Sequence, residues 1–433
     1  MERGSGFASV FGHGGWLRRA GPVALAFYAL AIWAAVGWTG ALAEGPIKVG
    51  LLLTYIGPTS IFARYEDKGA RLLIDETNKS GGIGGRKIEL VNYDTEGKPD
   101  RAGTLYRRLA QEDNVAAVIG PDSIFVLLGM SDIPSEVKVI SVSSPGLYEL
   151  VAPQKRRYIV SAQVATTFAG TLVLAYVKDK FHAKRLGMIT TSDVIGQTIA
   201  STVGKMAAAF GMELVDVASQ PASDRDLLPS LHKLATLQPK IDALYVFGSG
   251  PFANIAMNQS ELAGIDVPIA YNGGNVIPEL IKDLSPETAK RTFLAVARST
   301  VWSTLPAADR QDPTIANFLK DYRAKFGEEP TLPSAVGYDM ALPIVDELKN
   351  VGTDREKLTE YIHDKQRISG AQGIEFKRTW ADGYGSDPAE LAVASVSDGQ
   401  FVFRGFLKDS LRNIGFTKED MLNKMRELKL VAE

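Results

Sequence analysis

The sequence predicts an α/β protein with two lobes, each built on a parallel sheet. From Ile47 onward, short apolar runs alternate with helical patterns, and a second series of the same kind begins near Ser161. The strand–helix–strand order implies right-handed crossovers between parallel strands. The chain has 433 residues with 45% hydrophobic and 23% charged content, which is globular material and more than one core usually fills.

In the first series, the run Ile47–Leu53 reads as a buried strand. A helix follows it, with one apolar face formed by Ala63, Ala70, Leu73 and Ile74. Glu66 is expected on the polar side of this helix, in solvent. The further strands are expected at Ile88–Asp94, Val115–Ile119 and Val137–Val142, with a second helix on Ala102, Leu105, Tyr106 and Leu109.

The second series predicts four strands, each accompanied by a helical pattern. The strands are expected at Arg185–Ile189, Glu213–Ala218, Ala243–Phe247 and Val267–Tyr271. The helices are expected at Phe168–Tyr176, Ile199–Phe210, Leu227–Leu237 and Phe252–Leu262.

Beyond about Phe293 the pattern is less regular, although four features remain readable. Helices are expected at Phe318–Phe326 and Ala335–Leu348, and an antiparallel hairpin is expected to turn at Asp398-Gly399. The segment Lys418–Leu430 is a charged amphipathic helix, predicted to dock on a core. A helix for a partner or for self-association is the alternative.

The N-terminal segment has the pattern of a secretory signal peptide. Arg18 and Arg19 precede the uncharged apolar run Val23–Val36, and Ala41-Leu42-Ala43 supplies an A-x-A end. We therefore expect cleavage after Ala43 and export to the periplasm. An uncleaved anchor is the alternative, because the apolar character continues almost to Ala43. No later segment approaches the length of a membrane span, so the mature chain is not expected to be embedded in a membrane.

Charge and composition exclude several classes of function. The formal net charge of −2 argues against a nucleic-acid partner, because such proteins carry a basic excess. The chain has no cysteine, which excludes disulfides, thiolate metal sites and cysteine nucleophiles. Its four histidines lack the spacing of metal ligands, so neither a metal nor another cofactor is expected.

The string Gly248–Ala253 is the strongest enzyme-like motif, because it matches G-x-G-x-x-[GA] after a strand. A dinucleotide site would also need an acidic residue after the next strand, but the loop there, Tyr271–Asn275, contains none. In addition, Pro251 removes a backbone N–H donor from the turn that would hold the phosphates. A glycine-rich ligand loop is the favoured interpretation. Serine catalysis is disfavoured, because His363 is the only later histidine and its charged helix is predicted to be solvated.

Polar loops follow several of the predicted strands. In open α/β sheets, ligands bind outside the carboxyl ends of the strands. Hydroxyls and exposed amides there suit a small anion or polar group, so the loops together predict a ligand cleft. These loops are Thr54–Pro58, Gly120–Ser123, Ser141–Gly146, Thr190–Asp193 and the loop at Gly248.

The segment Gly81–Leu90 (GGIGGRKIEL) carries a resemblance to a known family. Together with Ile74–Asn78, Gly120-Pro121, Ser143-Ser144-Pro145 and Tyr338-Asp339, it resembles the periplasmic solute-binding proteins of branched-chain amino-acid ABC transporters. The resemblance runs from about Ile47 to about Phe406. It implies two Rossmann-like lobes of the type I periplasmic binding fold, joined by a three-crossover hinge, with a ligand cleft between them.

The resemblance also implies a division of the chain and a set of ligand-binding residues. After the leader at 1–43, the first lobe comprises 44–161 and 291–373, and the second comprises 162–290 and 374–433. Seven positions are carried over as ligand-binding residues: Tyr55, Ser123, Ser143 and Ser144 in the first lobe, and Asp193, Ser249 and Asn272 in the second.

The function implied is that of a non-catalytic component that delivers a small solute to an ABC transporter permease. An exported sensor of the same fold and a dehydrogenase using the Gly248 loop are the alternatives. The family's usual acid after Val267–Tyr271 is replaced by amides and glycines, which leaves Asp193 as the expected ammonium partner. The predicted ligand is therefore a carboxylate or amide with an apolar or aromatic body, ahead of an amino acid. Phe125 and Phe252 are candidate contacts, with core packing as the alternative.

Overall fold

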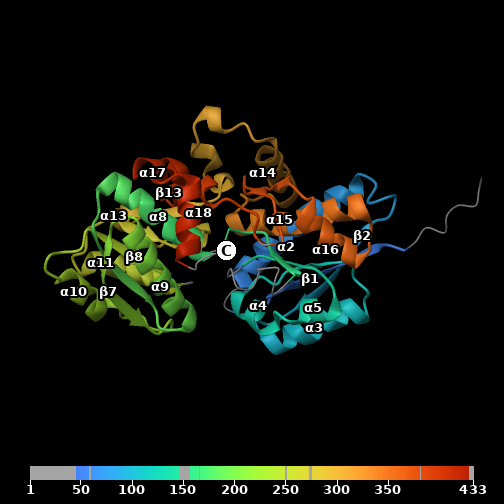
Figure 1. The fold of residues 1–433 in the computed structure, drawn as a ribbon, viewed down its shortest axis with the longest axis horizontal. Helices are drawn as coiled ribbons and strands as arrows, with labels where there is room; N and C mark the ends of the chain where they lie inside the picture. The colour runs from blue at the N-terminus through green and yellow to red at the C-terminus, as the bar shows by residue number, and fades with distance from the viewer. Residues whose placement is uncertain are drawn as a thin grey trace, which may run out of the picture. The chain divides into compact units, whose positions relative to one another are not determined.

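A computed structural model describes residues 45–57, 60–145, 157–164, 166–248, 251–272, 276–380 and 382–428 (Figure 1). The predicted signal peptide and the cleavage position after Ala43 lie outside these residues. Within the described part of the chain, no helix combines the length and apolar character needed to cross a membrane.

The first sheet has five strands, all parallel, in the order β2-β1-β3-β4-β5. The strand β1, which lies inside this sheet, is buried along almost its whole length, as its largely apolar sequence predicts. The strands are β1 Ile47–Leu53, β2 Ile88–Asp94, β3 Val118–Ile119, β4 Ser141–Ser143 and β5 Ile159–Ser161.

Helices from two distant parts of the sequence cover this sheet. The early ones are α2 Ser60–Lys79, α3 Pro99–Gln111, α4 Ile124–Met130 and α5 Ile133–Val137, and the late ones are α14 Pro313–Phe326, α15 Leu332–Val351 and α16 Arg355–Asp364. α2 and α15 lie side by side (Figure 1) and share one core with β1. The late segment therefore completes the first lobe.

The second sheet has seven strands in the order β14-β13-β10-β9-β8-β6-β7. The strands from β10 to β7 are parallel, whereas β13 is antiparallel to both β10 and β14. The predicted hairpin at Asp398-Gly399 is confirmed. The strands are β6 Arg185–Thr191, β7 Glu213–Gln220, β8 Ala243–Val246, β9 Ile269–Tyr271, β10 Thr292–Val296, β13 Ala392–Ser397 and β14 Gln400–Phe406. Because β10 belongs to this sheet, the second lobe continues past residue 290, where the resemblance implied that this segment of the lobe ends.

The helices of the second lobe include the C-terminal pair. Met421 and Met425 are buried in the core of this lobe, which confirms the prediction that the last helix docks. The helices are α8 Thr166–Phe181, α9 Val194–Ala209, α10 Leu228–Ala235, α11 Pro251–Leu262, α12 Pro278–Ile281, α13 Pro286–Arg291, α17 Leu407–Asn413 and α18 Lys418–Glu427.

The chain passes from one lobe to the other three times: after β5, after β10 and after α16. These passages are hydrogen-bonded to one another. Arg378 Nη2 donates to Ser161 O at 2.6 Å, Gln372 Nε2 to Ala162 O at 2.7 Å, and Arg298 Nη2 to Gly373 O at 2.6 Å. The predicted α/β class with two lobes is thus confirmed. The short elements in and near these passages are β11 Ile368–Ser369, β12 Glu375–Phe376, and the 3₁₀ helices η2 Arg298–Thr304, η3 Ala307–Asp309 and η4 Pro388–Glu390.

The prediction that His363 lies in solvent is wrong. Its side chain is 2% exposed, and its ring stacks on Trp380 with 4.3 Å between centroids. Its two ring nitrogens lie within hydrogen-bond distance of the carbonyl oxygens of Thr379 and Arg157. The helical pattern of α16 gave no sign of this, because the residues that cover His363 come from other parts of the chain.

Candidate functional site

The turn after β3 brings two strand-end loops of the first lobe together. Gly120 has a φ of 112°, and a Cβ at this position would lie 2.2 Å from Leu52 O, so only glycine fits there. Just beyond the turn, Ser144 N donates to Pro121 O at 3.1 Å. The loop carrying Asp122 and Ser123 therefore lies against the loop that follows β4.

Glu66 of α2 lies beside these loops, and the expectation that it is solvated is wrong. Its side chain is 4% exposed, and its Oε1 accepts a hydrogen bond from Ser144 Oγ at 2.6 Å. Burial, and secondarily the nearby carboxyl of Asp122, raise the pKa of Glu66 well above its usual value. A signal was available in the sequence, because Glu66 is three residues after Ala63 and four before Ala70, on the apolar face.

Asp122 is the second acid at this place. Its Oδ1 accepts a hydrogen bond from Thr54 Oγ1 at 2.9 Å, and Thr54 is in turn 2.8 Å from Thr95 Oγ1. Burial raises the pKa of Asp122 to about 6. Among the described residues, neither Glu66 Oε2 nor Asp122 Oδ2 has a hydrogen-bond partner, although both atoms are buried.

The four predicted residues of the first lobe have different surroundings. Ser123, Ser143 and Ser144 are all buried on adjacent loops at the carboxyl edge of the sheet. The Ser143 hydroxyl lies within hydrogen-bond distance of two backbone carbonyls, those of Pro145 and Val160. Ser123 is the N-terminal cap residue of α4, but its side chain makes no capping hydrogen bond. The structure therefore brings the three serines together.

Tyr55 faces a different neighbourhood. Its hydroxyl lies 2.7 Å from Asp67 Oδ1 on α2 and 2.9 Å from Asn92 Oδ1 on β2. Burial raises the pKa of the Tyr55 hydroxyl above its usual range. The hydroxyl thus contacts α2 and the edge strand, and it makes no hydrogen bond to the three serines.

In the second lobe, two of the three predicted residues are described. Asp193 is exposed and caps α9, where its Oδ1 accepts from Gly196 N at 2.8 Å. Asn272 is buried after β9 and lies against α8: a Cβ on Gly170 would be 2.5 Å from Asn272 Cγ. Both follow strands at the carboxyl edge of this sheet, separated by β8. Ser249 lies outside the described residues.

The two phenylalanines considered as ligand contacts differ in exposure. Phe252 is fully buried in the core of the second lobe, whereas Phe125 is 55% exposed at the start of α4. Ile56 after β1 and Val194 at the start of α9 are also exposed. Apolar side chains are therefore available at the carboxyl edges of both sheets, but Phe252 is a core residue.

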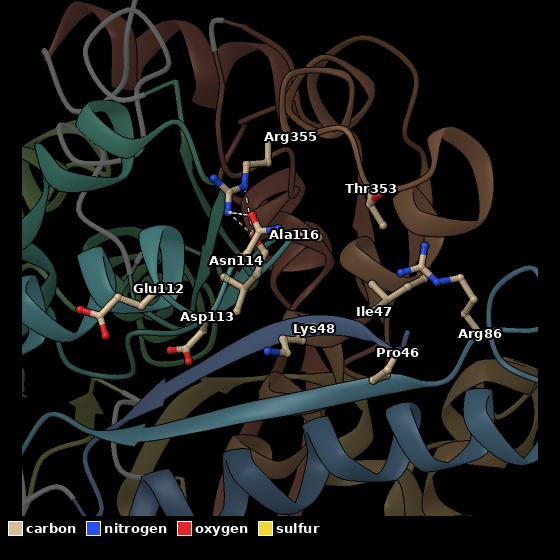
Figure 2. A pocket seen from close by; sticks show the side chains of 11 residues that line it. Pro46, Ile47, Lys48, Arg86, Glu112, Asp113, Asn114, Ala116, Thr353 and Arg355 are labelled. Atoms are coloured by element: carbon tan, nitrogen blue, oxygen red, sulfur yellow. Dashed lines mark hydrogen bonds between the residues drawn. The ribbon is translucent and has the colours of Figure 1, made fainter. Parts of the chain in front are cut away.

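A polar pocket of about 340 Å³ opens at the opposite edge of the first sheet, beside the start of β1 (Figure 2). Lys48 and Arg86 line it. The guanidinium of Arg355 donates to the backbone carbonyls of Ala110 and Val115, so this arginine ties the loop before β3 to α16. The pocket lies at the amino ends of the strands, away from the predicted residues. No metal-binding cluster of three or more histidine or acidic side chains occurs among the described residues.

Comparison with known proteins defines the class. Residues 46–400 match the family described as periplasmic binding protein, and the chain belongs to that family. The resemblance found in the sequence is thereby confirmed. The chain is 21% identical over 324 residues to the leucine-, isoleucine-, valine-, threonine- and alanine-binding protein of Pseudomonas aeruginosa, covering 74% of this chain and 82% of that relative.

Solved structures share the fold. A branched-chain amino acid transporter substrate binding protein of Streptococcus pneumoniae, in complex with isoleucine, superposes with a TM-score of 0.70 at 23% identity, covering 83% of this chain and 99% of that one. An ABC transporter solute binding protein of R. palustris, in complex with benzoate, gives a TM-score of 0.69 at 21% identity, covering 84% and 96%. Each of these proteins holds a small acid.

Proposed function

We propose that this protein captures a small solute outside the cytoplasmic membrane and delivers it to the permease of an ABC transporter, without a catalytic step. The observation that carries the proposal is the grouping of Ser123, Ser143 and Ser144 with Glu66 and Asp122 at the carboxyl edge of the first sheet. Ligands of open α/β sheets bind at this edge. The family and the relatives' named ligands support the same function.

The ligand is a small carboxylate or amide with an apolar or aromatic body, or an amino acid. The relatives named above support this range, since one is named for amino acids and another holds benzoate. Tyr55, Ser123, Ser143 and Ser144 of the first lobe would face Asp193, Ser249 and Asn272 of the second. Exposed Phe125 would pack against the ligand body.

Export and lobe division belong to the same proposal. A leader over residues 1–43, removed after Ala43, would release the protein into the periplasm.

The division proposed places 44–161 and 291–373 in the first lobe and 162–290 and 374–433 in the second. The location of β10 in the second sheet favours moving the boundary at 290 to the end of that strand.

A melting-shift screen tests the proposed function. A ligand that binds only the folded protein raises the melting temperature, and the stabilisation at one hundred times Kd is about 2.7 kcal/mol. We expect at least one compound among small acids, amides and amino acids to raise it, and nicotinamide dinucleotides to leave it unchanged. The proposal fails if none of these solutes gives a shift at millimolar concentration.

A further inference from the structure

We propose that the first lobe recognises a ligand group that donates hydrogen bonds, an amide N–H, amidine or ammonium, through an acceptor cluster formed by Glu66, Asp122, Ser144 and Thr54. This inference rests on the proposed function and narrows its ligand class. It assigns Glu66 and Asp122 as specificity-determining residues. The residues predicted from the sequence assigned ligand binding at this place to serines alone.

The first argument is that the protons of the Ser144, Thr54 and Ser143 hydroxyls are already used. Ser144 Oγ donates to Glu66 Oε1, and Thr54 Oγ1 donates to Asp122 Oδ1. Within the described part of the chain, the Ser143 hydroxyl has backbone carbonyls as its hydrogen-bond partners, so its proton is directed to them. Each of these hydroxyls has one proton, so what it can still offer a ligand is a lone pair. The surface formed by these loops therefore accepts hydrogen bonds more readily than it donates them.

The second argument comes from the two carboxyl oxygens without partners. Within the described residues, Glu66 Oε2 and Asp122 Oδ2 are buried and accept no hydrogen bond. A buried acceptor without a donor is costly, and a hydrogen bond from an ionised partner is stronger than a neutral one. Asp122 as a whole residue is only half-buried, so the cluster lies close beneath the surface of the lobe, although the two free oxygens are themselves covered. A ligand N–H placed beside either oxygen would satisfy it.

The third argument is electrostatic. Glu66 and Asp122 lie close enough that the charge of one makes ionisation of the other more costly. The nearby cations on α2 do not offset this cost, because Lys68 pairs with Glu328 and Arg71 pairs with Asp67. A ligand carboxylate at the same place would add a third negative group to a buried site. An ammonium or amidinium group would compensate the acids, and a neutral amide would donate without adding charge.

Isothermal titration calorimetry with compounds matched in their bodies tests this inference. The probes are benzoate, benzamide and benzamidine, together with 4-methylpentanoate, leucine and leucinamide, at pH 7.5. We expect each N–H-bearing probe to bind at least about tenfold more tightly than the acid with the same body, the change expected from one hydrogen bond to a charged group. In Glu66→Gln, whose side chain supplies an N–H of its own, this preference should shrink to about threefold or less.

Two further variants complete the design. Asp122→Asn should also weaken the preference for N–H-bearing probes, because it replaces one of the free carboxyl oxygens. Glu89→Gln, on exposed β2 away from the cluster, should leave every affinity unchanged. If Glu66→Gln misfolds, which circular dichroism would reveal, the Asp122→Asn ratios decide the matter.

The outcomes separate the inference from the function on which it rests. Equal or tighter binding of benzoate and 4-methylpentanoate by the wild type overturns the inference and leaves the proposed function standing. A preference for N–H-bearing probes that persists in both variants overturns the role of the cluster, since the acids would then be a structural pair sharing a proton. Absence of binding by all six probes overturns the inference, and the wider melting screen then decides the function separately.

Discussion

Asp122 shows how burial alters one carboxyl group at the edge of the first sheet. Its ordinary pKa is near 3.8, and burial raises the value to about 6. The carboxylate of Asp94 adds to this increase in pKa and the Thr54 hydroxyl opposes it, while the carboxyl of Asp122 in turn raises the pKa of Glu66 on α2. The protonated form is therefore the stable one in the folded lobe below about pH 6.

This pKa predicts how Asp122→Asn changes stability with pH. Between pH 4 and 6 the folded wild type holds a proton on Asp122 that the unfolded chain has released. This bound proton contributes to the stability of the folded state at low pH, and the contribution is lost as the pH rises through 6. The amide stays neutral and can still accept from Thr54. We expect the variant to gain stability over the wild type between pH 5 and pH 8, by the order of 1 kcal/mol.

The measurement is the melting temperature of both proteins from pH 5 to pH 8 by scanning calorimetry. Using the difference between the two proteins removes contributions from other buried acids, such as Asp339, whose pKa burial raises to about 7. A difference that stays constant across the range would show that Asp122 titrates as an ordinary surface acid.

At the scale of elements, the contact between α2 and α15 decides the environment of Glu66. The two helices approach so closely that a Cβ on Gly69 would lie 1.9 Å from Ser334 O, and one on Gly337 would lie 2.0 Å from Glu66 O. This approach places the backbone of α15 against the backbone of Glu66, so a segment from the far end of the sequence lies beside this residue.

Gly69→Ala is therefore expected to destabilise the first lobe. The added methyl group meets backbone, which cannot rotate away, and overpacking of this kind costs about 1–3 kcal/mol. Chemical denaturation with guanidinium measures the effect. Gly204→Ala is the matched control: the new Cβ would lie 3.4 Å from Leu214 Cδ2 in ordinary contact, and helix propensity predicts a gain of about 0.5–1 kcal/mol. Equal midpoints for the two variants would contradict the close crossing.

At the scale of the molecule, the three passages between the lobes form one hydrogen-bonded group. Asp339 on α15 accepts from the backbone N–H of Gln372 at 3.1 Å and from its Nε2 at 2.8 Å. The same Nε2 donates to Ala162 O, so the first and third passages are tied to one helix of the first lobe. Because the three passages are short and bonded to one another, we expect the two lobes to rotate as rigid bodies about this one place. Independent movement of each passage is disfavoured.

Ligand binding is expected to change the size of the protein in solution. A solute that contacts both lobes favours the closed arrangement, because it binds that state more tightly than the open one. We expect small-angle X-ray scattering to show a smaller radius of gyration with a saturating solute from the melting screen. A solute that gives no melting shift is the control. An unchanged radius at saturation would contradict closure by a hinge.

Much of this architecture could be predicted from local sequence. The predicted runs Ile47–Leu53 and Arg185–Ile189 are strands because a largely apolar sequence suits a sheet buried on both faces. The hairpin at Asp398-Gly399 follows from turn chemistry, and Met421 and Met425 dock because they share one face of a helix. The predicted serines could be placed at strand ends because they lie at or just after apolar runs that read as strands.

The sequence by itself determined most of the longer elements, their order and the class of protein, because periodicity and turn residues act over a few neighbouring positions. It did not predict β10, α4 or α5, and the strand expected at Val137–Val142 is only Ser141–Ser143. Only the tertiary structure decided the state of the charged side chains. His363 looks like a surface residue in its own helix, yet it is buried against Trp380 and Arg157 from other segments. Glu66 lies on the apolar face of its helix, but its hydrogen bond from Ser144 comes from a distant loop. Burial and the distance to a second charge set the cost of ionisation, and both depend on which distant segments meet. The chemistry of the candidate site is therefore a property of the assembled lobe, because the helix that packs against the backbone of Glu66 joins the first sheet only after the chain has built most of the second.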